Sequence, residues 1–245
     1  TSKVAINSEN VNDNQTFTVT ILHPTWDQAT TSKQVFIDEN GQLKVKSGYS
    51  LGKYFKHEVR KVGGLQFLKA LFEELTGKPS IRIYGEPTPE VAAAPDTQVE
   101  RLKVNFPEPI DGVYYLMIDA DGWILSDILI QYDDLEKLRE YIDQYFVDNG
   151  LDYLAGVEVL VCYSSRSQLN DAGELTGAFN AHLYLMLDSP VQLEELRRWA
   201  HAVNARLSRK ALDGAVYRAV QPDYIQPPEF VDGATDPFPE RRIHI

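Results

Sequence analysis

The sequence contains a single cysteine, Cys162, among its 245 residues. One thiol can form neither an internal disulfide nor the multi-cysteine ligand set of a zinc knuckle, so we expect neither disulfides nor zinc. Long hydrophobic runs are also lacking, since none approaches the roughly 18 apolar residues of a membrane span. The first residues contain no apolar core of a signal peptide. We therefore expect a cytoplasmic protein with no membrane partner.

Positive charge is scarce, because 24 Lys and Arg face 36 Asp and Glu, giving a net charge of −12. This balance argues against a protein that binds polyanions with its whole surface. Two stretches are nevertheless basic, and they could follow a phosphate backbone or simply be solvated faces. Their basic residues are Lys44, Lys46, Lys53, Lys56, Arg60 and Lys61 in the first, and Arg197, Arg198, Arg206, Arg209, Lys210 and Arg218 in the second.

The first 100 residues predict an N-terminal α/β module. "FTVTIL" and "KQVFIDENGQLKVK" read as strands, the second as a hairpin that turns at residues 39–41. "LQFLKALFEELTG" has apolar residues at helical spacing and ends on Gly77, a typical residue after a helix. "SIRIYG" predicts a short strand, and "EPTPEVAAAPDTQ" an exposed loop.

Residues 101–245 predict a second module with the element order β-α-β-β-α-β. Strands are expected at "GVYYLMIDADG", "VEVLVCYSS", "FNAHLYLML" and "GAVYRAV", and helices at "YDDLEKLREYIDQYFVDNG" and at "SPVQLEELRRWAHAVNARLSRK", which would begin with a Ser-Pro cap. This order is that of RRM-like folds, in which the helices cover one sheet face and leave the other open. We expect an α+β protein whose two modules form one domain. Because the chain starts without Met and stops on "RRIHI", we also expect it to be part of a longer protein.

Asp119 and Asp121 lie at the end of the strongly apolar stretch "YLMIDADG". In a strand, residues two apart project to the same face, so the two carboxylates would repel by roughly 4 kcal/mol at an effective dielectric of about 20. A divalent cation between them removes this repulsion, and a set of oxygen ligands suits Mg²⁺ or Mn²⁺. The pair is alternatively a simple turn, because "DADG" is also good turn sequence.

His182 lies in "FNAHLYLML", where Leu183, Leu185 and Leu187 would take the opposite face of the strand. The first and third strands are neighbours in a β-α-β-β-α-β sheet, so His182 is expected near Asp119. A strand histidine can equally be an ordinary hydrogen-bonded residue. A third acid would complete a two-metal site. Asp213 is our candidate, with Asp188 and Asp223 as competitors.

Three segments occur in an order that resembles motifs I to III of the archaeo-eukaryotic primase superfamily, in particular its plasmid and phage branch. They are "LMIDADG", "NAHLYLML" and "LDGAVYRAVQPDYIQPPEF". Asp119 and Asp121 match motif I, Asn180 and His182 match motif II, and Asp213 matches motif III. Asn180 stands where the family usually has Ser. The resemblance spans residues 50–245 in order.

The resemblance implies a primase or DNA polymerase, a nucleotidyltransferase that builds strands from NTPs or dNTPs on single-stranded DNA during plasmid, phage or mobile-element replication. It implies that Asp119, Asp121 and Asp213 hold two Mg²⁺ or Mn²⁺ ions and that His182 contacts the nucleotide phosphates. Asn180, Ser164, Ser165 and Arg166 would adjoin the nucleotide, although "CYSSRSQ" is equally typical of a polar hairpin. DNA contacts are expected at Lys53, Lys56, Arg206, Arg209, Lys210 and Arg218, and a helicase domain in the full-length protein.

Three other functions remain open. A nucleotide cyclase would use similar acids on a free triphosphate without a template. A non-catalytic RRM-like module would bind single strands without metal, but acids at its sheet centre would repel phosphate. A rolling-circle nicking enzyme usually has a His-x-His motif, and none of the five histidines forms one.

Overall fold

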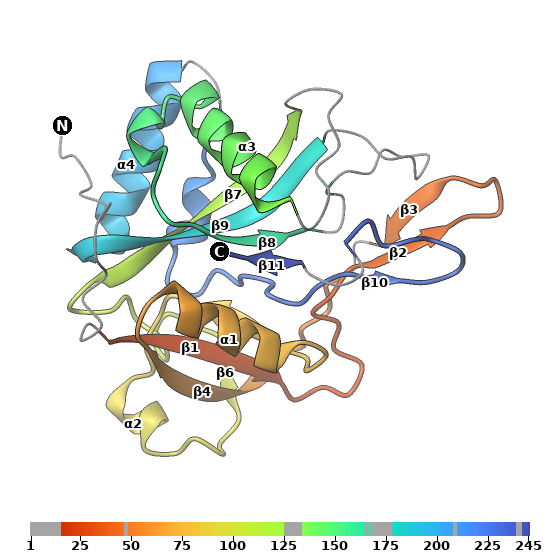
Figure 1. The fold of residues 1–245 in the computed structure, drawn as a ribbon. Coiled ribbons are helices and arrows are strands. Elements are labelled where there is room, and N and C mark those ends of the chain that lie inside the picture. Colours follow the sequence, from red (N-terminus) through yellow and green to blue (C-terminus); the bar gives the residue numbers. More distant parts are fainter. Residues whose placement is uncertain are drawn as a thin grey trace.

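The computed structural model describes residues 16–46, 49–124, 134–164, 167, 178–207, 210–238 and 242–245. Within them the chain is α+β, as expected, and its strands form three sheets (Figure 1). We call these the N-terminal sheet, the arm sheet and the C-terminal sheet. None of the helices in the described ranges is long and apolar enough to cross a membrane.

The N-terminal sheet has the strand order β5-β1-β4-β6, comprising β5 (Ile81–Ile83), β1 (Phe17–Pro24), β4 (Tyr54–Val62) and β6 (Val99–Glu100). Alternate residues of β1 enter the large core with helix α1 (Leu65–Leu75), whereas Leu22 joins a smaller cluster with Ile81 and Ile83. The predicted helix is thus confirmed, and Gly77 just beyond it has a positive φ of 78°. The expected loop contains a short helix, α2 (Pro89–Ala92).

The arm sheet is the predicted hairpin, β2 (Gln34–Ile37) and β3 (Leu43–Lys46), with an additional strand. Gly41 has a φ of 74° in the turn, a conformation that glycine adopts without steric cost. The additional strand is β10 (Glu229–Phe230), which pairs in parallel with β2. A segment near the C-terminal end of the sequence therefore completes a sheet that begins in the first 50 residues.

The C-terminal sheet has the order β11-β8-β9-β7 (Figure 1). Its strands are β11 (Ile243–His244), β8 (Leu160–Tyr163), β9 (Ala178–Val191) and β7 (Val113–Ile124), and all neighbours are antiparallel. The helices α3 (Leu135–Asp148) and α4 (Leu193–Leu207) lie on one side. As predicted, the first and third strands of this module, β7 and β9, are neighbours. A short 3-10 helix, η1 (Asp152–Leu154), follows α3.

The predicted strand at "GAVYRAV" is wrong, because residues 214–217 form a 3-10 helix, η2 (Gly214–Tyr217). The Asp213 carboxylate accepts a hydrogen bond from the Ala215 N–H at 3.0 Å, and Arg197 donates to the Tyr217 carbonyl at 2.7 Å. These bonds satisfy the backbone groups of the segment locally, so a sheet ladder is not needed. The fourth strand of the sheet is instead β11, which pairs with β8 at the opposite edge.

Two further expectations are corrected. Ser189 and Pro190 do not cap the second helix, because β9 continues through them to Val191 and α4 begins at Leu193. The sheet face opposite the helices is not open along its length either. Phe72 of α1 packs on Tyr184 of that face, with ring centroids 5.2 Å apart. Helix α1 therefore covers this face around Tyr184.

Candidate active site

Asp119 and His182 lie directly opposite each other on β7 and β9. The imidazole Nε2 is 3.7 Å from the Asp119 carboxylate Oδ1. The His182 and Asp119 side chains are 22% and 36% exposed, respectively, so both can reach a ligand. The structure thus brings together the two residues that the sequence placed on neighbouring strands.

Asp223 holds the other side of the imidazole. Its Oδ1 lies 3.0 Å from His182 Nδ1, while its Oδ2 accepts hydrogen bonds from the Tyr184 hydroxyl at 2.6 Å and from Arg82 Nε at 2.7 Å. Burial opposes ionisation of this carboxyl, but the Arg82 charge and the bonds from His182 and Tyr184 hold the pKa of Asp223 well below its ordinary value. Asp223 is therefore a buried carboxylate ion.

Arg82 balances this buried charge from the N-terminal sheet. Its guanidinium also donates to the Tyr115 hydroxyl at 2.7 Å, and Arg82 and Asp223 exchange two backbone hydrogen bonds of 3.0 and 2.8 Å. Although burial favours the neutral form, the neighbouring Tyr115 hydroxyl and the Asp223 carboxylate raise the pKa of Arg82 further above its usual value. Arg82 and Asp223 are thus an ion pair inside the protein, adjacent to His182.

The charge environment raises the pKa values of both His182 and Asp119. Burial opposes protonation of His182, but the bond and charge of Asp223 and the charge of Asp119 raise its pKa above the ordinary value. Burial raises the pKa of Asp119; His182 opposes this rise, while Asp121, Asp223 and Asp213 add to it. Asp119 therefore lies where negative charge accumulates, which is the condition under which a cation binds well.

Asp121 and Asp213 lie near Asp119 but do not close around it. Asp121 is exposed two residues along β7, and Asp213 precedes η2, which contacts β7. The Asp213 carboxylate is engaged with the Ala215 N–H and, at 3.3 Å, with Lys210 Nζ. Burial opposes the shift, but these two partners lower the pKa of Asp213. The predicted third acid is thus beside β7 with its side chain occupied.

The ligand types present suit a hard divalent cation, because Asp119, Asp121 and Asp213 offer only carboxylate oxygens. Across the described ranges, however, no three His, Cys, Asp or Glu side chains stand close enough together to hold an ion. Asp213 would have to leave Lys210 to join the other two. The donor chemistry therefore fits Mg²⁺ or Mn²⁺, provided that the Asp213 side chain turns toward β7.

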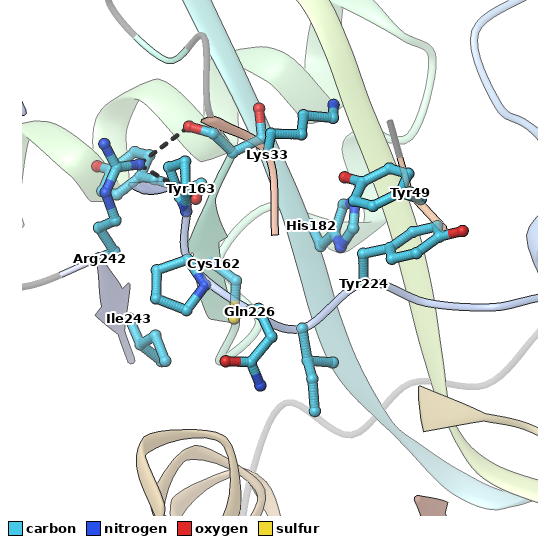
Figure 2. Close-up of a pocket in the computed structure, with 13 residues that line it drawn as sticks. Lys33, Tyr49, Cys162, Tyr163, His182, Tyr224, Gln226, Arg242 and Ile243 are labelled. Atoms are coloured by element: carbon cyan, nitrogen blue, oxygen red, sulfur yellow. Dashed lines mark hydrogen bonds between the residues drawn. The ribbon is translucent and has the colours of Figure 1, made fainter. Parts of the chain in front are cut away.

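A small pocket of about 60 Å³ adjoins His182 (Figure 2). Tyr49 and Tyr224 form one wall, with parallel rings whose centroids are 3.4 Å apart, and Lys33 Nζ lies 5.7 Å from the Tyr49 centroid. Small-molecule sites usually have about 300–1,000 Å³, so a whole nucleotide does not fit without rearrangement. The other lining residues are Cys162, Tyr163, Ser164, Ile225, Gln226, Pro227, Pro228, Arg242 and Ile243.

The predicted nucleotide-binding residues are only partly visible. Ser164 lines the pocket, and its backbone N–H donates a hydrogen bond of 2.9 Å to the carbonyl of Asn180 in β9. Asn180 itself is buried, being 7% exposed, which limits its contact with a ligand. Ser165 and Arg166 lie outside the described residues. Ser164 is thus the member of this group best placed beside His182.

The predicted DNA-binding residues are dispersed. Lys53 pairs with Glu100 at 3.1 Å, and Arg206 donates to the Gly150 carbonyl on the helical side. Lys210 pairs with Asp213, whereas Lys56 is exposed on β4 and Arg218 is exposed just after η2. Arg209 lies outside the described residues. Of this set, Lys210 and Arg218 are beside the candidate site, since both influence the Asp213 charge.

Comparisons with protein families, with curated proteins and with solved structures found no match. A function is therefore inferred from the geometry of the residues themselves and from the motif order.

Proposed function

We propose that the chain is the catalytic domain of a DNA-directed primase-polymerase, with an archaeo-eukaryotic primase fold. It would add nucleotides from NTPs or dNTPs to a strand paired with a single-stranded DNA template, in plasmid, phage or mobile-element replication. The observation that carries the proposal is the apposition of Asp119 and His182, which match motifs I and II. Asp213 beside β7 supports it, because its charge reaches Asp119.

Each residue has a distinct task in this proposal. Asp119, Asp121 and Asp213 would hold two Mg²⁺ or Mn²⁺ ions, whose charge would assist ionisation of a 3′-hydroxyl and offset the charge of the triphosphate. His182 directs Nε2 toward the end of the sheet where a phosphate oxygen would lie, and a protonated imidazole is a strong donor to such an oxygen. Ser164 lines the adjoining pocket and contributes a hydroxyl donor.

The fold favours this proposal over a simple RRM-like binding module. Such a module uses an exposed sheet face with aromatic side chains for stacking. Here the aromatic residues Tyr115 and Tyr184 of that face are buried, and the partly exposed residues on it include Asp119. Two acids repel a nucleic acid unless a cation intervenes, so a metal-dependent reaction suits the site better than metal-free binding.

The test is nucleotide incorporation on a primed single-stranded template with Mg²⁺ or Mn²⁺. The double variant Asp119→Ala, Asp121→Ala should lose activity by a factor on the order of 10³ or more, because it removes ligands worth several kcal/mol in the transition state. Asp188→Ala is the matched control, since Asp188 is an exposed acid at the far end of β9. The proposal fails if the double variant is as active as the parent.

The same assay separates the alternatives. Product that forms equally well without a template would point to a cyclase-like enzyme acting on free triphosphate. Tight binding of single strands in excess chelator, with no incorporation under any metal condition, would point to a non-catalytic module. Either result would overturn the proposed function.

A further inference from the structure

The ion pair between Arg82 and Asp223 lies directly behind His182, and none of the tasks above uses it. Arg82 is 1% and Asp223 3% exposed at the side chain, and their closest atoms are 2.7 Å apart. Burying two charges costs several kcal/mol per ion, and well-packed apolar residues would commonly serve stability as well or better. The position of the pair against the imidazole therefore calls for an explanation other than packing.

Asp223, an ion-pair partner of Arg82, lies against Nδ1 of the His182 imidazole. An ionised carboxylate has no hydrogen to donate, so in the 3.0 Å ion pair between His182 Nδ1 and Asp223 Oδ1 the hydrogen belongs to Nδ1. The other carboxylate oxygen, Oδ2, is fixed by Arg82 and Tyr184, which prevents the carboxylate from turning away. With Nδ1 held in this way, Nε2 can only face the Asp119 end of the sheet.

We infer that Asp223 is the positioning residue of His182, and that Arg82 and Tyr184 position Asp223 in turn. This inference rests on the proposed function, in which His182 contacts a phosphate of the incoming nucleoside triphosphate. It adds that the N-terminal module is part of the active site, because Arg82 belongs to β5 of the N-terminal sheet. Carboxylates that orient a histidine commonly fix its tautomer and ring plane in this manner.

The direct test is nitrogen-15 NMR of the histidine side chains, which reports the protonation of each ring nitrogen without requiring activity. The chain has five histidines. The signals that disappear in the His182→Gln variant are those of His182. The wild-type protein should show Nδ1 protonated across the neutral range. In the variant Arg82→Met, Asp223→Leu, which replaces the ion pair with apolar side chains of similar size, Nδ1 should no longer be held in its protonated form, and its signal should move toward that of an unprotonated ring nitrogen.

Nucleotide kinetics provide the second readout. The same double variant should raise the KM for dNTP about tenfold, because the imidazole loses the carboxylate that orients it and the hydrogen bond from Nε2 to a charged phosphate is weakened, while its affinity for single-stranded DNA stays unchanged. Tyr184→Phe removes one bond to Asp223 and should give a smaller rise. Tyr141→Phe, a buried tyrosine of α3 on the other side of the sheet, is the control and should behave as the wild-type protein.

The outcomes separate this inference from the proposed function. An unchanged protonation pattern in the double variant, or an altered pattern with an unchanged dNTP KM, overturns the positioning role. If the wild-type protein incorporates no nucleotide but its NMR spectra change as expected, the proposed function fails, whereas the orientation of His182 by Asp223 is upheld. Thermal unfolding of every variant checks that a change in KM does not arise from loss of fold.

Discussion

Arg82 and Asp223 are joined twice, by a pair of backbone hydrogen bonds and by an ion pair between their side chains. The backbone bonds add the segment around Asp223 to the edge of β5, and the side chains meet between the N-terminal and C-terminal sheets. One junction therefore connects the two modules and also holds His182. Stability and site geometry are coupled at this point.

Removal of one member of the pair should destabilise the protein. Arg82→Met leaves Asp223 buried without its counterion, and breaking a buried pair in this way costs about 3–5 kcal/mol. Urea denaturation measures the change in the free energy of unfolding. Arg198→Met is the control: Arg198 is 74% exposed and pairs only at the surface with Glu194, so about 1 kcal/mol or less is expected. Equal stability of Arg82→Met and the parent would contradict a role for the pair.

The raised pKa of His182 predicts how stability depends on pH in the absence of divalent metal. Asp223, Asp119 and Arg82 surround the imidazole, and the first two favour its protonated form. A group whose pKa is higher in the folded state contributes stability that is complete below its ordinary value of 6.5 and is lost as pH rises through the folded value. The free energy of unfolding of the parent should therefore fall as pH rises above 6.5. In His182→Gln this fall should be smaller, because the contribution of the imidazole is missing.

Urea denaturation across the neutral and mildly alkaline range measures this difference. His201→Gln provides the matched control, because His201 is exposed on α4. It should retain the pH slope of the parent. If parent and His182→Gln have the same slope above the ordinary histidine pKa of 6.5, the imidazole does not gain a proton from its surroundings.

Two of the predicted template-binding lysines are Lys56 in β4 and Lys53 directly before it. They should contribute differently to the binding of single-stranded DNA. Glu100 neutralises Lys53, whereas no ion pair involves Lys56 among the described residues. We therefore expect Lys56→Glu to weaken single-strand binding more than Lys53→Glu does. For single strands the slope of log K against log salt changes by about 0.7 for each phosphate that the variant no longer neutralises.

Fluorescence anisotropy at several salt concentrations tests this prediction. Lys137→Glu on α3 is the control, because Lys137 is an exposed lysine that also has a carboxylate partner, Asp134. Unchanged affinity and slope in Lys56→Glu would remove β4 from the template path and leave Lys210 and Arg218 beside η2 as the basic residues to examine.

The apposition of Asp119 and His182 is predictable from the sequence, because periodicity identifies both strands and their order makes them neighbours. Asp223 is predicted only as a competitor for a metal ligand. It lies in an irregular segment without periodicity and reaches His182 through tertiary contacts. The sequence does contain one indication, since Arg82 stands between two isoleucines in "SIRIYG", and all three residues are buried. A buried arginine requires a counterion, but the sequence does not identify which acid supplies it.

The fourth strand shows where local pattern misleads. "GAVYRAV" alternates like a strand, yet Asp213 and Arg197 satisfy its backbone and favour a 3-10 helix. Local sequence also fails to predict that the sheet face opposite the helices is covered. Both faces of β7 carry large apolar or aromatic residues, so the sequence is equally compatible with a second packed layer. Which layer covers that face depends on α1 and β5, far away in the sequence.

Incorporation on templates of defined sequence tests the central claim most directly. With Mg²⁺ or Mn²⁺ and a primed homopolymer of each base in turn, the protein should incorporate only the complementary nucleotide, and excess chelator should abolish the reaction. Incorporation that ignores the template base, or that continues in chelator, would contradict a metal-dependent, template-directed polymerase centred on Asp119 and His182.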